Sequence, residues 1–177
     1  MHKFRVVSVA LCLSAALLGN ALAQDVSLYV RLGKKEGIKI LVDDFVGRVA
    51  ADTRINKKFA KTNVDRVKLM LVEQLCGATG GPCKYTGLNM KTAHKNMGVT
   101  EGEFGALVED FIATLDKFKM PEKEKKELLG LLGPMKSDIV EVKSKDTGTP
   151  LPAKFKPAPP LNGGKAGAEK AKSGKGN

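Results

Sequence analysis

The stretch from Cys76 to Thr100 constrains the fold of this chain more than any other. It interrupts an apolar helical pattern with a glycine-rich segment at 77–82, which ends in a proline. Glycine and proline stop a helix, because one is too flexible and the other lacks an N–H group. The chain then presents His94 on a short helical turn before another helix begins. This stretch therefore predicts two helices joined by a non-helical segment that carries a histidine.

The rest of the body shows apolar residues at intervals of three and four, which is the pattern of amphipathic helices. Asn63 is a predicted N-cap, and Thr100 with Glu103 forms a predicted capping box. No stretch alternates as a strand does, so the body is predicted to be all-α. The expected helices are a short turn within 25–33, then about 35–51, 64–76, a short turn at His94, one opening at 101 and one from 122 to about 139. A kink is expected at Gly133-Pro134.

Residues 1–23 have the features of a cleavable signal peptide. Lys3 and Arg5 precede a nearly continuous apolar run from 6 to 18, and Ala21-Leu22-Ala23 has the form of a cleavage site. The alternative is an uncleaved anchor, but the run falls short of the roughly 20 residues that span a bilayer. We therefore expect a periplasmic or secreted protein that begins at residue 24 or 25, with Cys12 removed.

Cys76 and Cys83 are the two cysteines that remain after this cleavage. Disulfides persist in exported proteins, so we expect a bond between them, closing a small loop. Two free thiols are the alternative. A metal site has less support, because no second histidine or carboxylate cluster lies alongside.

The formal charge of +11 is unevenly distributed. Residues 142–177 carry eight lysines against two acidic residues, whereas residues 24–141 carry 20 basic and 17 acidic residues. The 142–177 segment is rich in Lys, Pro, Gly and Ala, and we expect it to be a disordered tail. It is either a soluble extension or a contact with anionic envelope polymers or an acidic redox partner. We expect no nucleic-acid partner, because the body is nearly balanced in charge.

His94 is the only histidine after the predicted cleavage. A histidine on an apolar helix face is more often packed than ligating, but a single neutral imidazole in an apolar pocket is what haem iron requires. The chain has no nucleophile elbow and no P-loop. No Cys-x-x-Cys-His occurs, so haem b would be held non-covalently. The predicted wall of this pocket is apolar and consists of Phe45, Phe59, Met90, Met97, Val99, Phe104 and Phe111.

Several short motifs, taken in order, resemble those of the truncated haemoglobins, group I. The resemblance runs from about residue 25 to 140 and implies a two-over-two helical sandwich around haem b. It also implies that His94 is the proximal iron ligand, that Phe59 stacks on the ring, and that residues 64–76 form the distal helix. The motifs are Leu28-Tyr-x-x-Leu-Gly33, Val42-Asp-Asp-Phe45, Gly80-Gly-Pro82, Tyr85-Thr-Gly87, Met90-x-x-Ala-His94 and Thr100-x-x-x-Phe104. We accordingly expect three regions, a signal peptide at 1–23, a haem domain at 24–141 and a tail at 142–177.

The chain departs from the family on the distal side. Val46 stands where the family usually has a tyrosine, and Val67 and Leu71 stand at the positions of its distal glutamines. Gln74, one turn further along, is the remaining candidate donor to a bound gas. A hydrogen bond in such a pocket contributes roughly 1–3 kcal/mol, so we expect faster loss of dioxygen than in members with a polar pocket.

Met70 stands where some members of the family supply a sixth ligand. The expected function is reversible binding of diatomic gases, as in oxygen transport or the handling of nitric oxide. One alternative is an electron-transfer protein with His94 and Met70 as ligands, and Met70 as a core residue is the simpler interpretation. Another is an enzyme that converts nitric oxide to nitrate with an external reductase, although the missing tyrosine weakens it.

Overall fold

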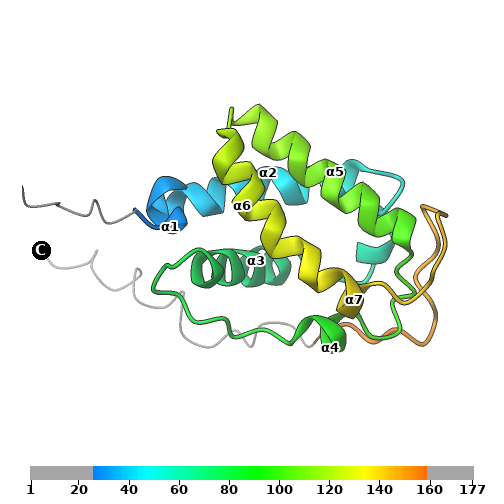
Figure 1. Cartoon of the computed structure of the whole chain (residues 1–177). Coiled ribbons are helices and arrows are strands. Elements are labelled where there is room, and N and C mark those ends of the chain that lie inside the picture. Colours follow the sequence, from blue (N-terminus) through cyan, green and yellow to red (C-terminus); the bar gives the residue numbers. More distant parts are fainter. Residues whose placement is uncertain (1–25, 159–177) are drawn as a thin grey trace, which may run out of the picture.

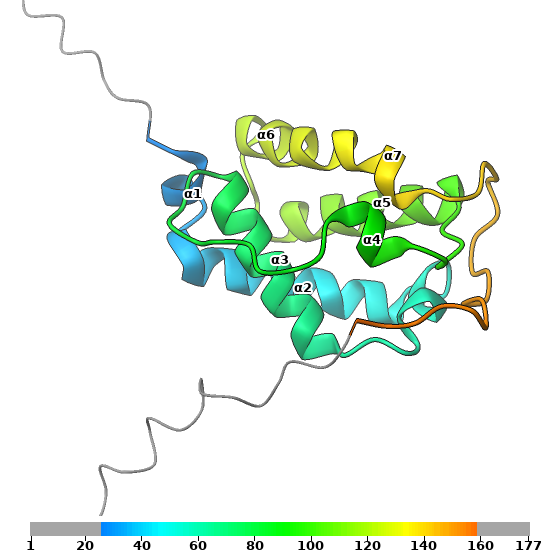
Figure 2. The ribbon, with the colours of Figure 1, turned by 90° about the horizontal axis from the view of Figure 1, so that it is seen from below.

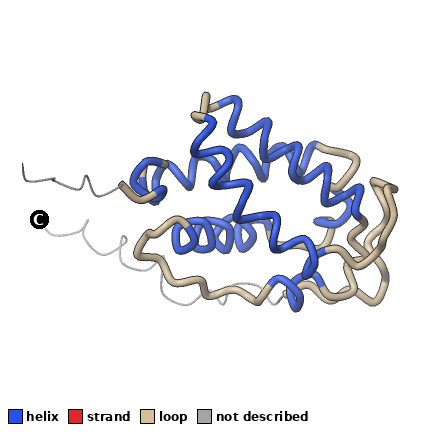
Figure 3. Tube along the Cα trace, viewed as in Figure 1, coloured by secondary structure: helices blue, strands red, loops and turns tan. Residues whose placement is uncertain are grey.

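The computed structural model describes residues 26–158, and these residues form a helical sandwich (Figure 1). No β-strand occurs in this range (Figure 3), where the only β-type pairing is an isolated parallel bridge between Thr100 and Val142. In chain order the elements are α1 (Leu28–Arg31), α2 (Lys34–Ala51), η1 (Asn56–Phe59), α3 (Val64–Ala78), α4 (Met90–His94), α5 (Glu101–Lys117), α6 (Glu122–Leu132), η2 (Gly133–Met135) and α7 (Lys136–Ile139). The predicted all-α class is confirmed.

Two helix pairs form the two layers. Helix α2 packs on α3, α5 packs on α6, and α2 also packs on α5, which joins the two layers. Figure 2 shows α4 and the long segment before it lying across the open side of this arrangement. In this arrangement α4, which carries His94, is in contact with α7.

The core follows the predicted apolar stripes. In α2 the buried residues are Ile38, Leu41, Val42, Phe45 and Val49, spaced at three and four residues. The ring of Phe45 meets that of Phe111 from α5 edge to face, with centroids 5.2 Å apart. Such aromatic pairs add about 0.5–1.5 kcal/mol beyond their buried area. This contact holds the two layers together at the centre of the core.

The predicted helix starts at α3 and α5 are also present. The side chain of Asn63 accepts the N–H of Arg66 at 2.9 Å. Thr100 and Glu103 form a reciprocal capping box, with each side chain accepting the other's backbone N–H. These caps satisfy N–H groups that the first helical turn leaves without partners.

The end of the folded region differs from the sequence-based prediction. Residues 142–158 were expected to belong to a disordered tail, but the described part of this segment packs on the body. Phe155 is only 7% exposed, and the backbone from 142 to 150 makes hydrogen bonds with the body. Average composition missed this because one buried aromatic and a series of backbone hydrogen bonds suffice to order the segment. The signal peptide at 1–23 and the rest of the tail, 159–177, lie outside the described residues.

Between residues 26 and 158 no helix has both the length and the apolar composition needed to span a membrane. The predicted kink at Gly133-Pro134 is present as the short 3-10 element η2, which separates α6 from α7. This break lets α7 turn toward α4, with which it is in contact.

Asp44 links α2 to α5. Its carboxylate pairs with Lys117, accepts the hydroxyl of Thr114 at 3.1 Å and accepts Arg48 at 2.9 Å. The hydrogen bond from Lys117 is the main cause that lowers the pKa of Asp44 from 3.8 to about 2. A carboxyl whose pKa is lower in the folded state stabilises the fold above its unfolded pKa.

We therefore predict that Asp44→Asn lowers the free energy of unfolding at neutral pH by about 1 kcal/mol, a small value because Lys117 is half exposed. The difference from wild type should be complete above pH 3.8 and should vanish as the pH falls toward about 2. Urea unfolding at a series of pH values measures it. A difference that stays constant over this range would show that the charge of Asp44 is not the stabilising feature.

Candidate functional site

His94 is the last residue of α4, a helix of five residues. The side chain of Asn89 caps the start of this helix by accepting the N–H of Thr92 at 2.8 Å. At the other end, the Nδ1 atom of His94 lies 2.8 Å from the carbonyl oxygen of Met90. A carbonyl oxygen can only accept, so Nδ1 carries the proton and Nε2 keeps its lone pair. This tautomer is the one in which a histidine binds a metal through Nε2.

The surroundings of His94 favour its neutral form. Burial lowers the pKa of the imidazole, and the backbone carbonyl of Met90 and the charge of Glu141 oppose this shift only in part. A neutral ring is the state that ligates a metal. The sequence-based choice of His94 as the central residue therefore agrees with its local geometry.

The predicted wall residues divide between two buried clusters. Phe45, Phe111 and the half-buried Val46, Phe59 and Leu71 belong to the cluster that fills the centre of the sandwich. Met90, Met97, Val99 and Phe104 belong to a second cluster with Ile139 and Phe155. Val67 is half-buried and is part of neither cluster. The sequence predicted these residues as the wall of one pocket. In the structure they belong to two separate buried clusters.

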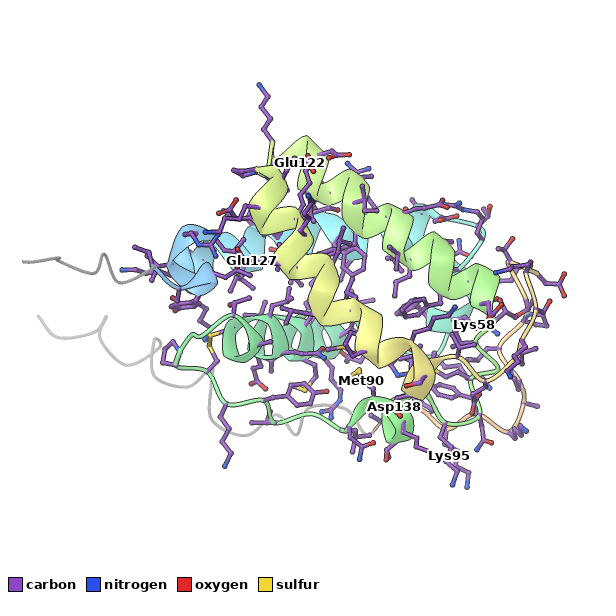
Figure 4. The ribbon with its side chains drawn as sticks, viewed as in Figure 1. Lys58, Met90, Lys95, Glu122, Glu127 and Asp138 are labelled. Atoms are coloured by element: carbon purple, nitrogen blue, oxygen red, sulfur yellow. A yellow bond between two sulfur atoms is a disulfide. The ribbon has the colours of Figure 1, made fainter. Side chains whose placement is uncertain are left out.

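Gln74 connects α3 to this second cluster. Its amide nitrogen lies 3.8 Å from the sulfur of Met90 and 3.4 Å from the sulfur of Met135. Figure 4 shows Met90 between α3 and α7. Thioether sulfur is a weak acceptor, so the amide is left poorly satisfied by the protein. An amide donor among thioethers is suited to a polar ligand between α3 and α4.

Met70 is half-buried, and its sulfur lies beside Gly87 in the segment between α3 and α4. A Cβ atom built on Gly87 would come within 2.8 Å of this sulfur. The thioether therefore packs against that segment in this structure.

The residues present fit a haem better than a bare metal ion. Within 26–158 no group of three His, Cys, Asp or Glu side chains could hold a metal by itself. One neutral imidazole with apolar and thioether neighbours instead suits an iron whose other ligands come from a porphyrin. His94 would be the protein ligand, and the wall residues of the two clusters would contact the ring.

Sequence reasoning missed two charged residues near the site, Glu141 and Lys58, and identified Glu103 only as part of a helix cap. The carboxylate of Glu141 accepts the N–H groups of Asn96 and Gly98, just after His94, at 2.7 and 2.6 Å. Lys58, which is labelled in Figure 4, is 3% exposed. It forms an ion pair with the buried Glu103 at 3.4 Å. Nothing in the sequence indicated that Lys58 is buried, because it stands beside Lys57 and near Lys61, which are the same residue type and are exposed.

The Cα atoms of Cys76 and Cys83 are 5.6 Å apart, and their sulfur atoms are at disulfide distance. Cys76 lies near the end of α3 and is fully buried. Cys83 lies in the segment that leads toward α4. The pair therefore connects the helix of Gln74 with the segment that carries His94.

Comparison with known proteins identifies the fold. Residues 27–141 match the bacterial-like globin family. The group 1 truncated haemoglobin GlbN of Mycolicibacterium paratuberculosis is 34% identical over 117 residues, covering 66% of this chain and 86% of that protein. The GlbN of Synechocystis is 36% identical over 100 residues, covering 54% and 81%.

Two solved structures show the same architecture. The truncated haemoglobin of Tetrahymena pyriformis in its Fe(III) form has 29% identity and a TM-score of 0.62, covering 65% of this chain and 98% of that one. The 2/2 haemoglobin of a Synechococcus species, in the cyanomet state with covalently attached haem, has 27% identity with the same coverage and TM-score.

A two-over-two helical sandwich is the architecture of a truncated globin. The chain belongs to the bacterial-like globin family and, within it, to the group 1 truncated haemoglobins. The resemblance predicted from the motifs is confirmed. Membership implies a haem cofactor and haem-based binding of diatomic ligands.

Proposed function

We propose that this protein holds haem b non-covalently through Nε2 of His94 and binds dioxygen, nitric oxide or carbon monoxide reversibly. The observation that carries the proposal is the hydrogen bond of Nδ1 to the carbonyl of Met90, which leaves Nε2 free. Haem supplies an iron to which such gases bind. The chain's own residues orient the imidazole, keep it neutral and cover the ring with apolar side chains.

The distal residues support weak retention of dioxygen. Val46 and Leu71 pack in the central apolar cluster, and their side chains have no hydrogen-bond donor. Gln74 is the polar donor of α3 that reaches Met90 of α4 and Met135 of η2. We infer that its amide is the donor to a bound gas, in place of the family's tyrosine and glutamines.

Replacing His94 tests the proximal ligand. We predict that His94→Gly loses most of its bound haem, because His94 is the only histidine between residues 26 and 158, and that added imidazole restores it. Haem content per polypeptide measures the loss, and circular dichroism checks that the helices remain. Full haem retention without imidazole would overturn the proposal.

Replacing Gln74 tests the distal donor. We predict that Gln74→Leu speeds the dissociation of dioxygen about tenfold, the effect of losing one hydrogen bond of roughly 1–3 kcal/mol. Carbon monoxide depends less on such a donor and should dissociate at nearly the wild-type rate. Glu73→Gln is the matched control, because Glu73 instead binds Thr86 on the neighbouring segment. Equal dioxygen rates in wild type and Gln74→Leu would exclude Gln74 as the donor.

We also propose export to the periplasm or medium, supported by the features of residues 1–23 and by the cysteine geometry. A contact of the basic tail with envelope polymers or a redox partner stays a proposal that rests on its charge alone. No observation favours electron transfer through Met70, whose sulfur lies beside Gly87, or an enzyme activity.

The cysteine pair provides a test of the proposed export. We predict that protein purified from the envelope has Cys76 and Cys83 bonded, so neither reacts with an alkylating agent until it is reduced. Replacing both with serine should lower the free energy of unfolding by about 2 kcal/mol, the loop-closure value for so short a loop. Mass spectrometry of non-reduced protein measures the first effect, and two alkylated cysteines would contradict it.

A further inference from the structure

We propose that residues 142–158, here called the C-terminal strap, position His94 by fixing the connector between α4 and α5. The strap follows the part of the chain that matches the globin family, which ends at residue 141. The inference rests on the proposed role of His94 as the iron ligand. It assigns the strap a role in setting the orientation of that ligand.

The strap first runs beside the connector. Val142 donates its N–H to the carbonyl of Val99 at 3.0 Å, and its own carbonyl accepts the N–H of Glu101 at 3.2 Å. The carbonyl of Ser144 then accepts the N–H of Gly102 at 3.0 Å. Backbone groups of the connector and of the first turn of α5 are thereby satisfied by the strap.

Further along, the strap closes over a buried ion pair. The N–H and hydroxyl of Thr149 donate to the carboxylate of Glu103 at 2.9 and 2.7 Å. The amine of Lys58 donates to the carbonyl of Pro150 at 3.3 Å and to those of Met97 and Gly98 at 3.0 Å. One ammonium group therefore holds both the strap and the connector.

The strap ends in an aromatic anchor. Phe155 is 7% exposed and lies in one cluster with Met97, Val99 and Ile139. Met97 donates its N–H to the carbonyl of His94 at 3.0 Å. A displacement of Phe155 would thus disturb the cluster that contains Met97, and Met97 is hydrogen-bonded to His94.

Close approach to Gly102 shows how tightly the strap is held. A Cβ atom at Gly102 would lie 2.2 Å from the carbonyl oxygen of Lys145 and 2.7 Å from that of Asp146. Any side chain at this position therefore displaces the strap. Gly105, one turn along the same helix, has no atom within 4 Å of its Cβ position.

This contrast gives a matched pair of variants of the full chain. We expect Gly102→Ala to shift the iron–histidine stretching band of the ferrous protein in resonance Raman spectra. It should also speed haem transfer to excess apomyoglobin about tenfold, which corresponds to roughly 1.4 kcal/mol. Gly105→Ala should change neither measurement, because alanine fits there and favours the helix.

Phe155→Ala should reproduce the shift of the iron–histidine band. Phe155→Leu, which keeps a large apolar side chain in the cluster, should leave the band as in the wild type. If Gly102→Ala does not fold, Thr149→Val, which removes only the hydroxyl donor to Glu103, gives the same readout. An unchanged band in these variants, even with a lower melting temperature, would overturn the inference. The strap would then contribute only to the stability of the fold. The absence of an iron–histidine band in the wild type would instead refute the proposed function itself.

Discussion

The buried ion pair between Lys58 and Glu103 is the interaction on which the arrangement around His94 depends. Both side chains are almost inaccessible to water, and their charged atoms are 3.4 Å apart. Charges out of water are tolerated only when partners satisfy them. Here the ammonium has three carbonyl acceptors, and the carboxylate accepts from the backbone of Thr100 and from Thr149. Four separate parts of the chain, η1, the α4–α5 connector, the start of α5 and the strap, meet at this pair.

This arrangement separates the two sides of the site. His94 is fixed by the carbonyl of Met90, by the caps of a short helix and by a connector held on both flanks. On the other side, Gln74 has only thioether partners, which hold an amide weakly. The proposed iron ligand is thus built on fixed elements, whereas the proposed donor to a gas has only weak partners within the protein.

Much of the fold followed from local sequence patterns. The stripe of α2, the N-cap at Asn63 and the capping box at Thr100 depend on residues within a few positions of one another, and all are present. The motifs around His94 also indicated the family correctly. The strap failed as a prediction because its order comes from distant partners, such as Arg54, whose carbonyl accepts the N–H of Gly148. Composition averaged over the segment contains no information about such contacts.

The sequence alone determined the helical class, the family and the choice of His94, because helix periodicity, capping and a single remaining histidine are properties of neighbouring residues. Only the tertiary structure decided that Lys58 is buried while Lys57 and Lys61 are not, since that depends on Glu103 and the strap closing over it. The tertiary structure alone also brought Gln74 to Met90 and Met135, because these residues lie on three elements that meet only when the sandwich is assembled.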